Sequence, residues 1–198
     1  AVMWGGTHPR FGKLPQSLGD YLRIFFVQEG GTNAPDNEIV NVLGNTVGAY
    51  DFSIWYHARN WEMVLFRHFY IETGPSLRFR NPLDGQWGLT IRRKEPGFLL
   101  DAFVWEHVNM LRQGAQYSMG EARGPDNYYN NVLYQGGWTY RGRSMGLPLL
   151  FADGERTGII NNMVLAHHLG IEGALPMNIT YKALGTLSRN YGASLIFE

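Results

Sequence analysis

The 198-residue sequence has no cysteine, few charged residues and no net charge. The absence of cysteine excludes a disulfide scaffold, a cysteine-ligated zinc site and thiol catalysis. The 17 Lys and Arg are balanced by 17 Asp and Glu. The chain therefore lacks the basic excess with which nucleic-acid-binding proteins neutralise phosphates, and we expect no nucleic-acid partner.

The sequence also lacks a long hydrophobic run. A transmembrane helix needs about 20 predominantly apolar residues, whereas the longest charge-free run, Thr157 to Ile171, contains two Asn and two His. A chain of this kind can enter a membrane only as strands. There is no initiator Met, no secretory leader and no lipidation signal, so we expect a processed or truncated start. The length fits one domain, residues 1–198.

Alternation of apolar and polar residues is the main pattern, together with 25 Gly and 14% aromatics. From Met177 to Asn190 the alternation is longer than an ordinary soluble strand of about 5 to 6 residues. Trp55 and Leu184 are exceptions within otherwise regular stretches. We predict antiparallel strands over Thr46–His57, Asn60–Tyr70, Gln86–Lys94, Phe98–Met110, Asn161–Gly173 and Asn178–Arg189.

Long alternating strands, many aromatics and few charges are typical of an all-β protein, an antiparallel transmembrane β-barrel. The alternative is a soluble β-sandwich or β-barrel with one polar face. In the membrane barrel one set of side chains would face lipid and appear solvent-exposed. That set is Tyr50, Phe52, Ile54, Trp87, Leu89, Ile91, Ile179, Tyr181 and Leu187.

The expected connections alternate between short and long, as in outer-membrane barrels with short periplasmic turns and longer extracellular loops. The chain has room for eight to ten strands. One additional hairpin could join Gly137–Arg143 to Leu147–Phe151, and a last strand would cover Ala193–Phe197.

Five stretches resemble the capsule assembly protein Wzi family of Gram-negative outer membranes. They are THPRFGKLPQSLGDY (7–21), NPLDGQWG (81–88), YYNNVLYQGGWTYRGR (128–143), AHHLG (166–170) and SRNYG (188–192). The resemblance implies a large outer-membrane β-barrel that attaches capsular polysaccharide to the cell surface. The family barrel is about twice as long, so the resemblance also implies that this chain is part of a larger barrel. The partners it implies are capsular or other surface polysaccharide, outer-membrane lipid and other outer-membrane proteins.

One segment combines aromatic rings, amides and guanidinium groups. Rings can cover the C–H face of a sugar, while amides and Arg can bind hydroxyl and uronate groups. The same composition would suit an aromatic girdle or a loop that plugs the lumen. The candidate polysaccharide-binding residues are Tyr128, Tyr129, Asn130, Asn131, Trp138, Tyr140, Arg141 and Arg143, with Tyr134 in the same segment.

The histidines do not indicate a metal site. His167 and His168 are neighbours on a predicted strand, so their side chains point to opposite faces and cannot bind one metal ion from that strand. The other three candidates, His57, His68 and His107, lack the spacing of metal ligands. We expect these three to form hydrogen bonds in the lumen. We expect no cofactor. A polar network in the lumen is predicted for Arg92, Asp101, Glu172, Lys182 and Arg189, because charged side chains facing lipid are costly.

Three functional classes remain open. The first is a barrel that binds surface polysaccharide, without enzymatic activity. The second is a porin or transporter, which needs an open lumen. The third is a barrel lipid hydrolase, which needs Ser188 and His168 within hydrogen-bonding distance.

Overall fold

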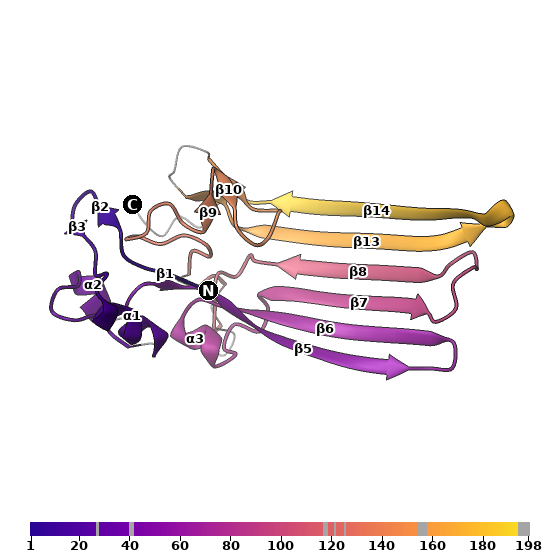
Figure 1. Ribbon diagram of the computed structural model, residues 1–198, viewed down its shortest axis with the longest axis horizontal. Helices are drawn as coiled ribbons and strands as arrows, with labels where there is room; N and C mark the ends of the chain where they lie inside the picture. Colours follow the sequence, from indigo (N-terminus) through magenta and orange to yellow (C-terminus); the bar gives the residue numbers. More distant parts are fainter. Residues whose placement is uncertain are drawn as a thin grey trace.

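A six-stranded antiparallel sheet with the order β14-β13-β8-β7-β6-β5 dominates the protein (Figure 1). The computed structural model describes residues 1–26, 28–39, 42–116, 119–120, 122–124, 126–153 and 158–193. The six strands are β5 (Gly48–His57), β6 (Trp61–Ile71), β7 (Gly85–Arg93), β8 (Ala102–Asn109), β13 (Val164–Leu175) and β14 (Ile179–Asn190). They confirm the six predicted antiparallel segments. The described residues do not close the sheet into a barrel, since β5 and β14 are its two edges.

Short elements surround this sheet. They are β1 (Val2–Met3), which pairs with β4 (Asn45–Thr46), β2 (Thr7–His8) with β3 (Gly12–Lys13), β9 (Thr139–Tyr140) with β10 (Arg143–Ser144), and β11 (Phe151–Ala152) with β12 (Ile159–Asn161). The helices are α1 (Leu18–Phe25), α2 (Asp36–Ile39), α3 (Gly74–Leu77) and a 3-10 turn, Pro176–Asn178. Among the described residues, no helix is long and apolar enough to cross a membrane.

The main sheet has six strands, fewer than the eight to ten for which the chain has room. Residues 1–47 and 110–163 contribute only helices, loops and strands of two or three residues to the described fold. The predicted hairpin between 137–143 and 147–151 is wrong, because β9 pairs with β10 and β11 pairs with β12. Of the predicted last strand, 194–197 lie outside the described residues.

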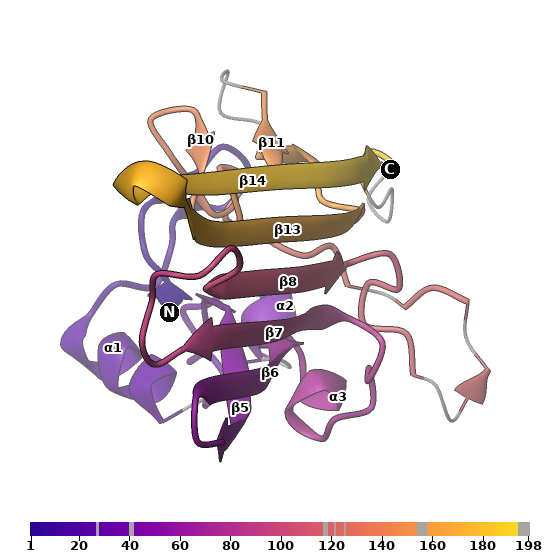
Figure 2. The ribbon, with the colours of Figure 1, turned by 90° about the vertical axis from the view of Figure 1, so that its right-hand side faces the viewer.

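The predicted alternation of connection lengths is confirmed. The connections 58–60, 94–101 and 176–178 lie at one end of the sheet, which we call the turn end. The longer connections 72–84 and 110–163 start from the opposite end, the loop end, where the N-terminal elements also lie (Figure 1). Seen from the turn end, the short elements lie behind and around the sheet (Figure 2). The two ends of the sheet are therefore built very differently.

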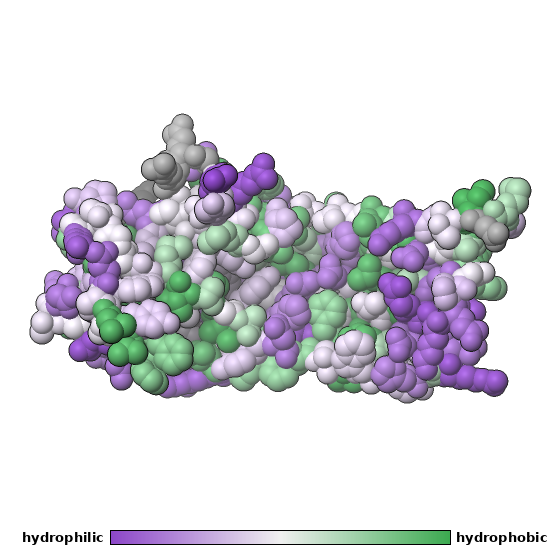
Figure 3. Space-filling view, in the orientation of Figure 1, coloured by the Kyte–Doolittle hydropathy of each residue, from purple (hydrophilic) through white to green (hydrophobic). Residues whose placement is uncertain are grey.

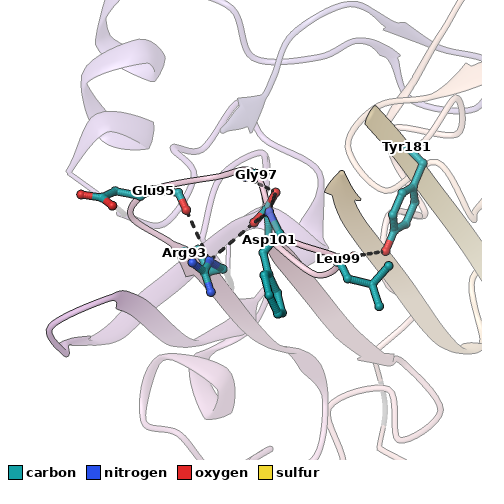
Figure 4. A network of polar contacts seen from close by, with 7 residues as sticks. Arg93, Glu95, Gly97, Leu99, Asp101 and Tyr181 are labelled. Atoms are coloured by element: carbon teal, nitrogen blue, oxygen red, sulfur yellow. Dashed lines mark hydrogen bonds and ion pairs between the residues drawn. The ribbon is translucent and has the colours of Figure 1, made fainter. Parts of the chain in front are cut away.

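The β7–β8 connection is longer than predicted and includes Phe98 to Asp101. The Asp101 carboxylate accepts hydrogen bonds from the backbone N–H groups of Gly97 (2.8 Å) and Phe98 (3.0 Å), and lies 3.6 Å from Nε of Arg93 (Figure 4). The Tyr181 hydroxyl donates to a carbonyl of the same connection. These contacts stabilise a loop where alternation alone predicted strand.

The start of β13 is also later than predicted. Asn162 is buried outside the strands, and its Nδ2 donates to Oδ1 of Asn127 and to the carbonyl of Tyr128, both at 2.6 Å. Its side chain therefore anchors the long connection 110–163 rather than continuing the sheet.

The strand register divides the sheet into two faces, because directly paired residues share a face. The apolar face carries Tyr50, Phe52, Ile54, Tyr56, Trp61, Met63, Leu65, Phe69, Trp87, Leu89, Ile91, Phe103, Trp105, Leu169, Ile171, Ile179, Tyr181 and Leu187. The polar face carries Asp51, Ser53, His57, Glu62, His68, Gln86, Thr90, Arg92, Glu106, His168, Glu172, Lys182, Thr186, Ser188 and Asn190.

Two glycines explain how large side chains fit on the polar face. Leu184 lies opposite Gly170, where an added Cβ would come within 2.7 Å of a Leu184 methyl group. Phe66 covers Gly88 even more closely, with the ring 2.0 Å from an added Cβ. The exception at Leu184 therefore has a packing reason, whereas Trp55 remains exposed.

Candidate functional site

The predicted polysaccharide-binding residues fall into a buried group and an exposed group. Tyr128 (2% exposed), Tyr129 and Trp138 (6%) belong to the main hydrophobic core. This core also contains Val108 of β8 and Ala166 of β13, which lie on the polar face at the loop end. The segment carrying these rings therefore packs onto the sheet, in the manner expected of a plug.

The two predicted asparagines stabilise the backbone of the same segment. Asn130 binds Ile159 twice, accepting from its N–H and donating to its carbonyl, both at 2.8 Å. Asn131 accepts from the N–H groups of Leu133 (2.9 Å) and Tyr134 (3.1 Å). In this structure both amides are occupied by such contacts.

Tyr140, Arg141 and Arg143 form the exposed group, on the β9–β10 hairpin. Tyr140 is 63% exposed and is paired with Arg143. The Arg141 guanidinium lies 5.4 Å from the centre of the Tyr140 ring. We call these three residues the hairpin patch. The polysaccharide site stays a prediction, and the hairpin patch is the part of it open to a large ligand.

A buried carboxylate that sequence reasoning missed connects this segment to the sheet. Asp84 accepts hydrogen bonds from the Tyr128 hydroxyl (2.8 Å) and from the N–H groups of Arg112 (3.0 Å) and Gly114 (2.8 Å). Asn81 also donates to the Tyr128 hydroxyl, at 3.1 Å. Burial raises the pKa of Asp84, although these donors partly offset the effect. Both Asn81 and Asp84 lie in the NPLDGQWG stretch.

Two further acids are buried nearby. Burial raises the pKa of Asp126 to about 6, despite a hydrogen bond of 3.2 Å from the Thr73 hydroxyl. Burial and the neighbouring Asp126 raise the pKa of Glu72 well above its usual range. Together with Asp84, these two acids make three carboxyl groups at the place where the 110–163 connection meets the end of β6. Among the described residues, no group of three or more His, Asp or Glu has a metal-binding arrangement.

A cavity of about 540 Å³ lies between the polar face and residues 146–149. This is within the range of roughly 300–1,000 Å³ typical of small-molecule sites. Its lining consists of Tyr70, Gln86, Glu106, Val108, Tyr129, Gly146, Leu147, Pro148, Leu149, Ala166, His168 and Thr186.

Four adjacent strands each contribute one polar side chain to this cavity. Glu106 of β8, His168 of β13 and Thr186 of β14 are consecutive partners in the register. Gln86 of β7 donates to Oε1 of Glu106 at 3.0 Å, and Nδ1 of His168 lies 2.7 Å from the Thr186 hydroxyl. The polar groups are therefore held in place before any ligand arrives.

The register shows what each histidine contacts. His167 and His168 lie on opposite faces, as predicted. His107 was predicted to share a polar environment with His57 and His68, but it lies on the apolar face, with its ring centre 4.5 Å from that of His167. Ser188 is paired with Ala166, so the hydrogen-bonding partner of His168 is Thr186 instead.

The register brings together only some of the residues of the predicted charge network. Glu172 and Lys182 are paired on the polar face, 4.0 Å apart, and Arg92 shares that face. Asp101 instead stabilises the β7–β8 connection, as described above. Arg189 is paired with Leu165 and therefore lies on the apolar face, where its guanidinium is 5.2 Å from the Tyr191 ring at the loop end.

The apolar face remains largely uncovered. None of the nine residues predicted to face lipid is buried, and Ile54 (70%) and Leu187 (76%) are the most exposed. In the space-filling view, hydrophobic residues also gather around α1 and α3, while hydrophilic residues gather on the lower part of the turn end (Figure 3). Along β5 to β7, the apolar face has a band of aliphatic residues between two groups of aromatic residues. The aromatic residues toward the loop end are Tyr50, Phe52, Phe69 and Trp87, and those toward the turn end are Tyr56 and Trp61. The aliphatic band consists of Ile54, Met63, Leu65, Leu89 and Ile91.

Arg67 lies on the same face, and its side chain is deeply buried. Its guanidinium donates to the carbonyls of Pro82 (2.9 Å) and Asp84 (2.6 Å). It also lies 4.3 Å from the ring centre of Phe69 and 5.1 Å from that of Trp87. The 72–84 connection thus shields this charge from the surroundings of the sheet.

The fold and site were compared with known proteins by family model, by sequence and by structure. No family model, no curated protein and no solved structure matches the chain.

Proposed function

We propose that this chain is a wall segment of a transmembrane β-barrel in the outer membrane of a Gram-negative bacterium, which binds or anchors capsular or other surface polysaccharide during capsule assembly. The resemblance to the Wzi family suggested this role. The observation that carries it is the sheet itself, with one exposed apolar face and one polar face covered at the loop end.

The apolar face supports the membrane part of the proposal. A soluble protein rarely exposes a continuous apolar surface of this extent. Aromatic side chains at both ends of an aliphatic band match the girdles of outer-membrane barrels. The unpaired edges β5 and β14 would be unstable in lipid, because backbone N–H and C=O groups need partners there. Further strands are therefore needed to close the barrel, and the proposal includes them.

The polysaccharide part of the proposal is supported by the hairpin patch. A tyrosine ring beside two guanidinium groups can stack on a sugar ring and bind acidic substituents. The long connections would be extracellular if the turn end is periplasmic, as in other outer-membrane barrels. The hairpin patch would then face the capsule.

Tyr140→Ala and Arg143→Ala should reduce retention of capsule on cells several-fold, with unchanged protein in the outer membrane. Met145→Ala, on the same hairpin, is the control. Trp138→Ala is unsuitable, because truncating a buried Trp costs about 3–5 kcal/mol and would disturb the fold. Full capsule on cells carrying the double variant Tyr140→Ala and Arg143→Ala would contradict the proposed binding surface.

The plug distinguishes this proposal from a porin. Tyr128, Tyr129 and Trp138 pack on the loop end of the polar face, whereas a porin needs that side of its sheet to remain open. A barrel hydrolase would have to use Thr186 in place of Ser188, since Thr186 is the side chain bonded to His168. We therefore propose a binding protein without catalytic residues.

A further inference from the structure

We propose that the cavity between the polar face and residues 146–149 binds an uncharged, hydroxyl-rich sugar residue. The inference rests on the proposed function, because it names the kind of saccharide that an inner site of the same barrel would hold. It concerns other residues than the hairpin patch, so the two can be tested separately.

The polar side of the cavity offers both kinds of hydrogen-bonding group that a sugar needs. Oε1 of Glu106 is engaged by Gln86, while Oε2 accepts no hydrogen bond from any described residue. His168 uses Nδ1 toward Thr186, which leaves Nε2 for a ligand. A carboxylate oxygen can accept from two neighbouring hydroxyls, and the imidazole can donate or accept according to its tautomer.

The opposite side of the cavity is apolar. Leu147, Pro148 and Leu149 line it from the 110–163 connection, and Val108 and Ala166 add two apolar side chains from the sheet. A sugar ring has an apolar C–H surface as well as polar edges, so it matches a site with one wall of each kind. A purely apolar ligand would leave Glu106 and His168 desolvated without partners.

The charge of the cavity selects among sugars. None of the described lining residues is Lys or Arg, whereas Glu106 contributes a carboxylate. A uronate, phosphate or sulfate group would lie beside a like charge without a compensating cation. Neutral residues are therefore favoured here, while the hairpin patch, with Arg141 and Arg143, suits acidic residues.

The test is titration of the full-length protein in detergent with chitotriose, maltotriose and trigalacturonate, by calorimetry. At least one neutral trisaccharide should bind, and at least tenfold more tightly than trigalacturonate. Thr186→Phe should abolish this binding by filling the cavity. Thr180→Phe is the matched control, because it places the same ring on the same face of β14 at the turn end, beside Ala174 and away from the lining residues.

A second pair of variants does not change the cavity volume. Glu106→Gln should weaken neutral-sugar binding roughly tenfold, the order expected for losing a charged hydrogen-bond acceptor. Glu172→Gln, on the same face beside Lys182, should leave it unchanged. Binding unaffected by both Thr186→Phe and Glu106→Gln, trigalacturonate binding as tightly as the neutral sugars, or no neutral trisaccharide binding at all would overturn the inference. If neutral sugars bind in the cavity but hairpin variants keep their capsule, the site stands and the capsule proposal falls.

Discussion

Buried carboxyl groups hold the segment that covers the sheet. Asp84 receives two backbone N–H groups and a tyrosine hydroxyl, so its charge is well solvated by the protein. Asp126 accepts a side-chain hydrogen bond from the hydroxyl of Thr73 and lies near Asp84. Two acids of similar burial therefore differ in how well the fold tolerates their ionised form.

Asp126 should make the protein less stable as the pH rises. Its pKa of about 6 in the folded protein lies above 3.8, the ordinary value expected in the unfolded chain, so the folded state holds the proton more strongly between these values. The contribution is fully favourable below about pH 4 and is lost as the pH passes through 6, a difference of about 3 kcal/mol. Glu72, with its raised pKa, acts in the same direction.

Asp126→Asn should remove this part of the pH dependence. We expect its free energy of unfolding, measured by urea titration in detergent at pH 4 and pH 8, to change less between the two than that of the unmodified protein. Asp51→Asn, at an exposed position of β5, is the control. Equal pH dependence in the Asp126→Asn variant and the unmodified protein would contradict the assignment.

The sequence grouped the candidate site residues in one segment but could not separate the buried residues from the exposed ones. Tyr128 and Tyr140 have the same chemistry, and one is in the core while the other is on a hairpin tip. What distinguishes Tyr128 is that its hydroxyl has two buried partners, Asn81 and Asp84. These partners are distant in sequence, so no local pattern reveals them.

The strands are where sequence reasoning succeeded. Alternation reports which side chains share a face, and a face that contacts one environment along its whole length produces a regular pattern. The ends of the strands were less predictable, since they depend on contacts such as those of Asp101 with the backbone of its own loop. Those contacts do not change the alternation.

The two faces of β7 should respond oppositely to a charge. Leu89→Arg puts a guanidinium on the apolar face and should reduce the folding free energy in lipid vesicles by about 2–4 kcal/mol, the cost of Arg facing the bilayer midplane. Thr90→Arg, one residue along, puts it on the polar face and should have a much smaller effect. Equal losses in the two variants would show that the apolar face does not meet lipid.

The whole molecule is asymmetric, with nearly all irregular structure at the loop end (Figure 1). The chain contains no cysteine, so its orientation can be read from single introduced thiols. A membrane-impermeant maleimide added to intact cells should label Arg143→Cys, on the β9–β10 hairpin. It should label Arg59→Cys, in the 58–60 turn, only after the outer membrane is permeabilised. The reverse pattern would place the hairpin patch on the periplasmic side.

Sequence reasoning was weakest at this largest scale. Counting about 20 residues per strand and turn overestimates the number of strands in the sheet, because the 110–163 connection and the N-terminal residues pack as a cover. Their composition, rich in Gly and aromatics, resembles that of the sheet itself. What separates the cover from the sheet is the set of long-range contacts in the core around Trp138.

The insertion of 110–163 between β8 and β13 divides the sheet into two parts that differ in how they can fold. The strands β5 to β8 join through connections of modest length, and β13 and β14 join through 176–178, so each part can form by local hairpin closure. The seam between β8 and β13 must close a long loop and should form late. Core residues from both sides of the seam, Val108 and Ala166, pack with Tyr128 and Trp138 of the insertion. The insertion therefore sets the register at the seam, where a slip by one residue would exchange His167 and His168 between the two faces.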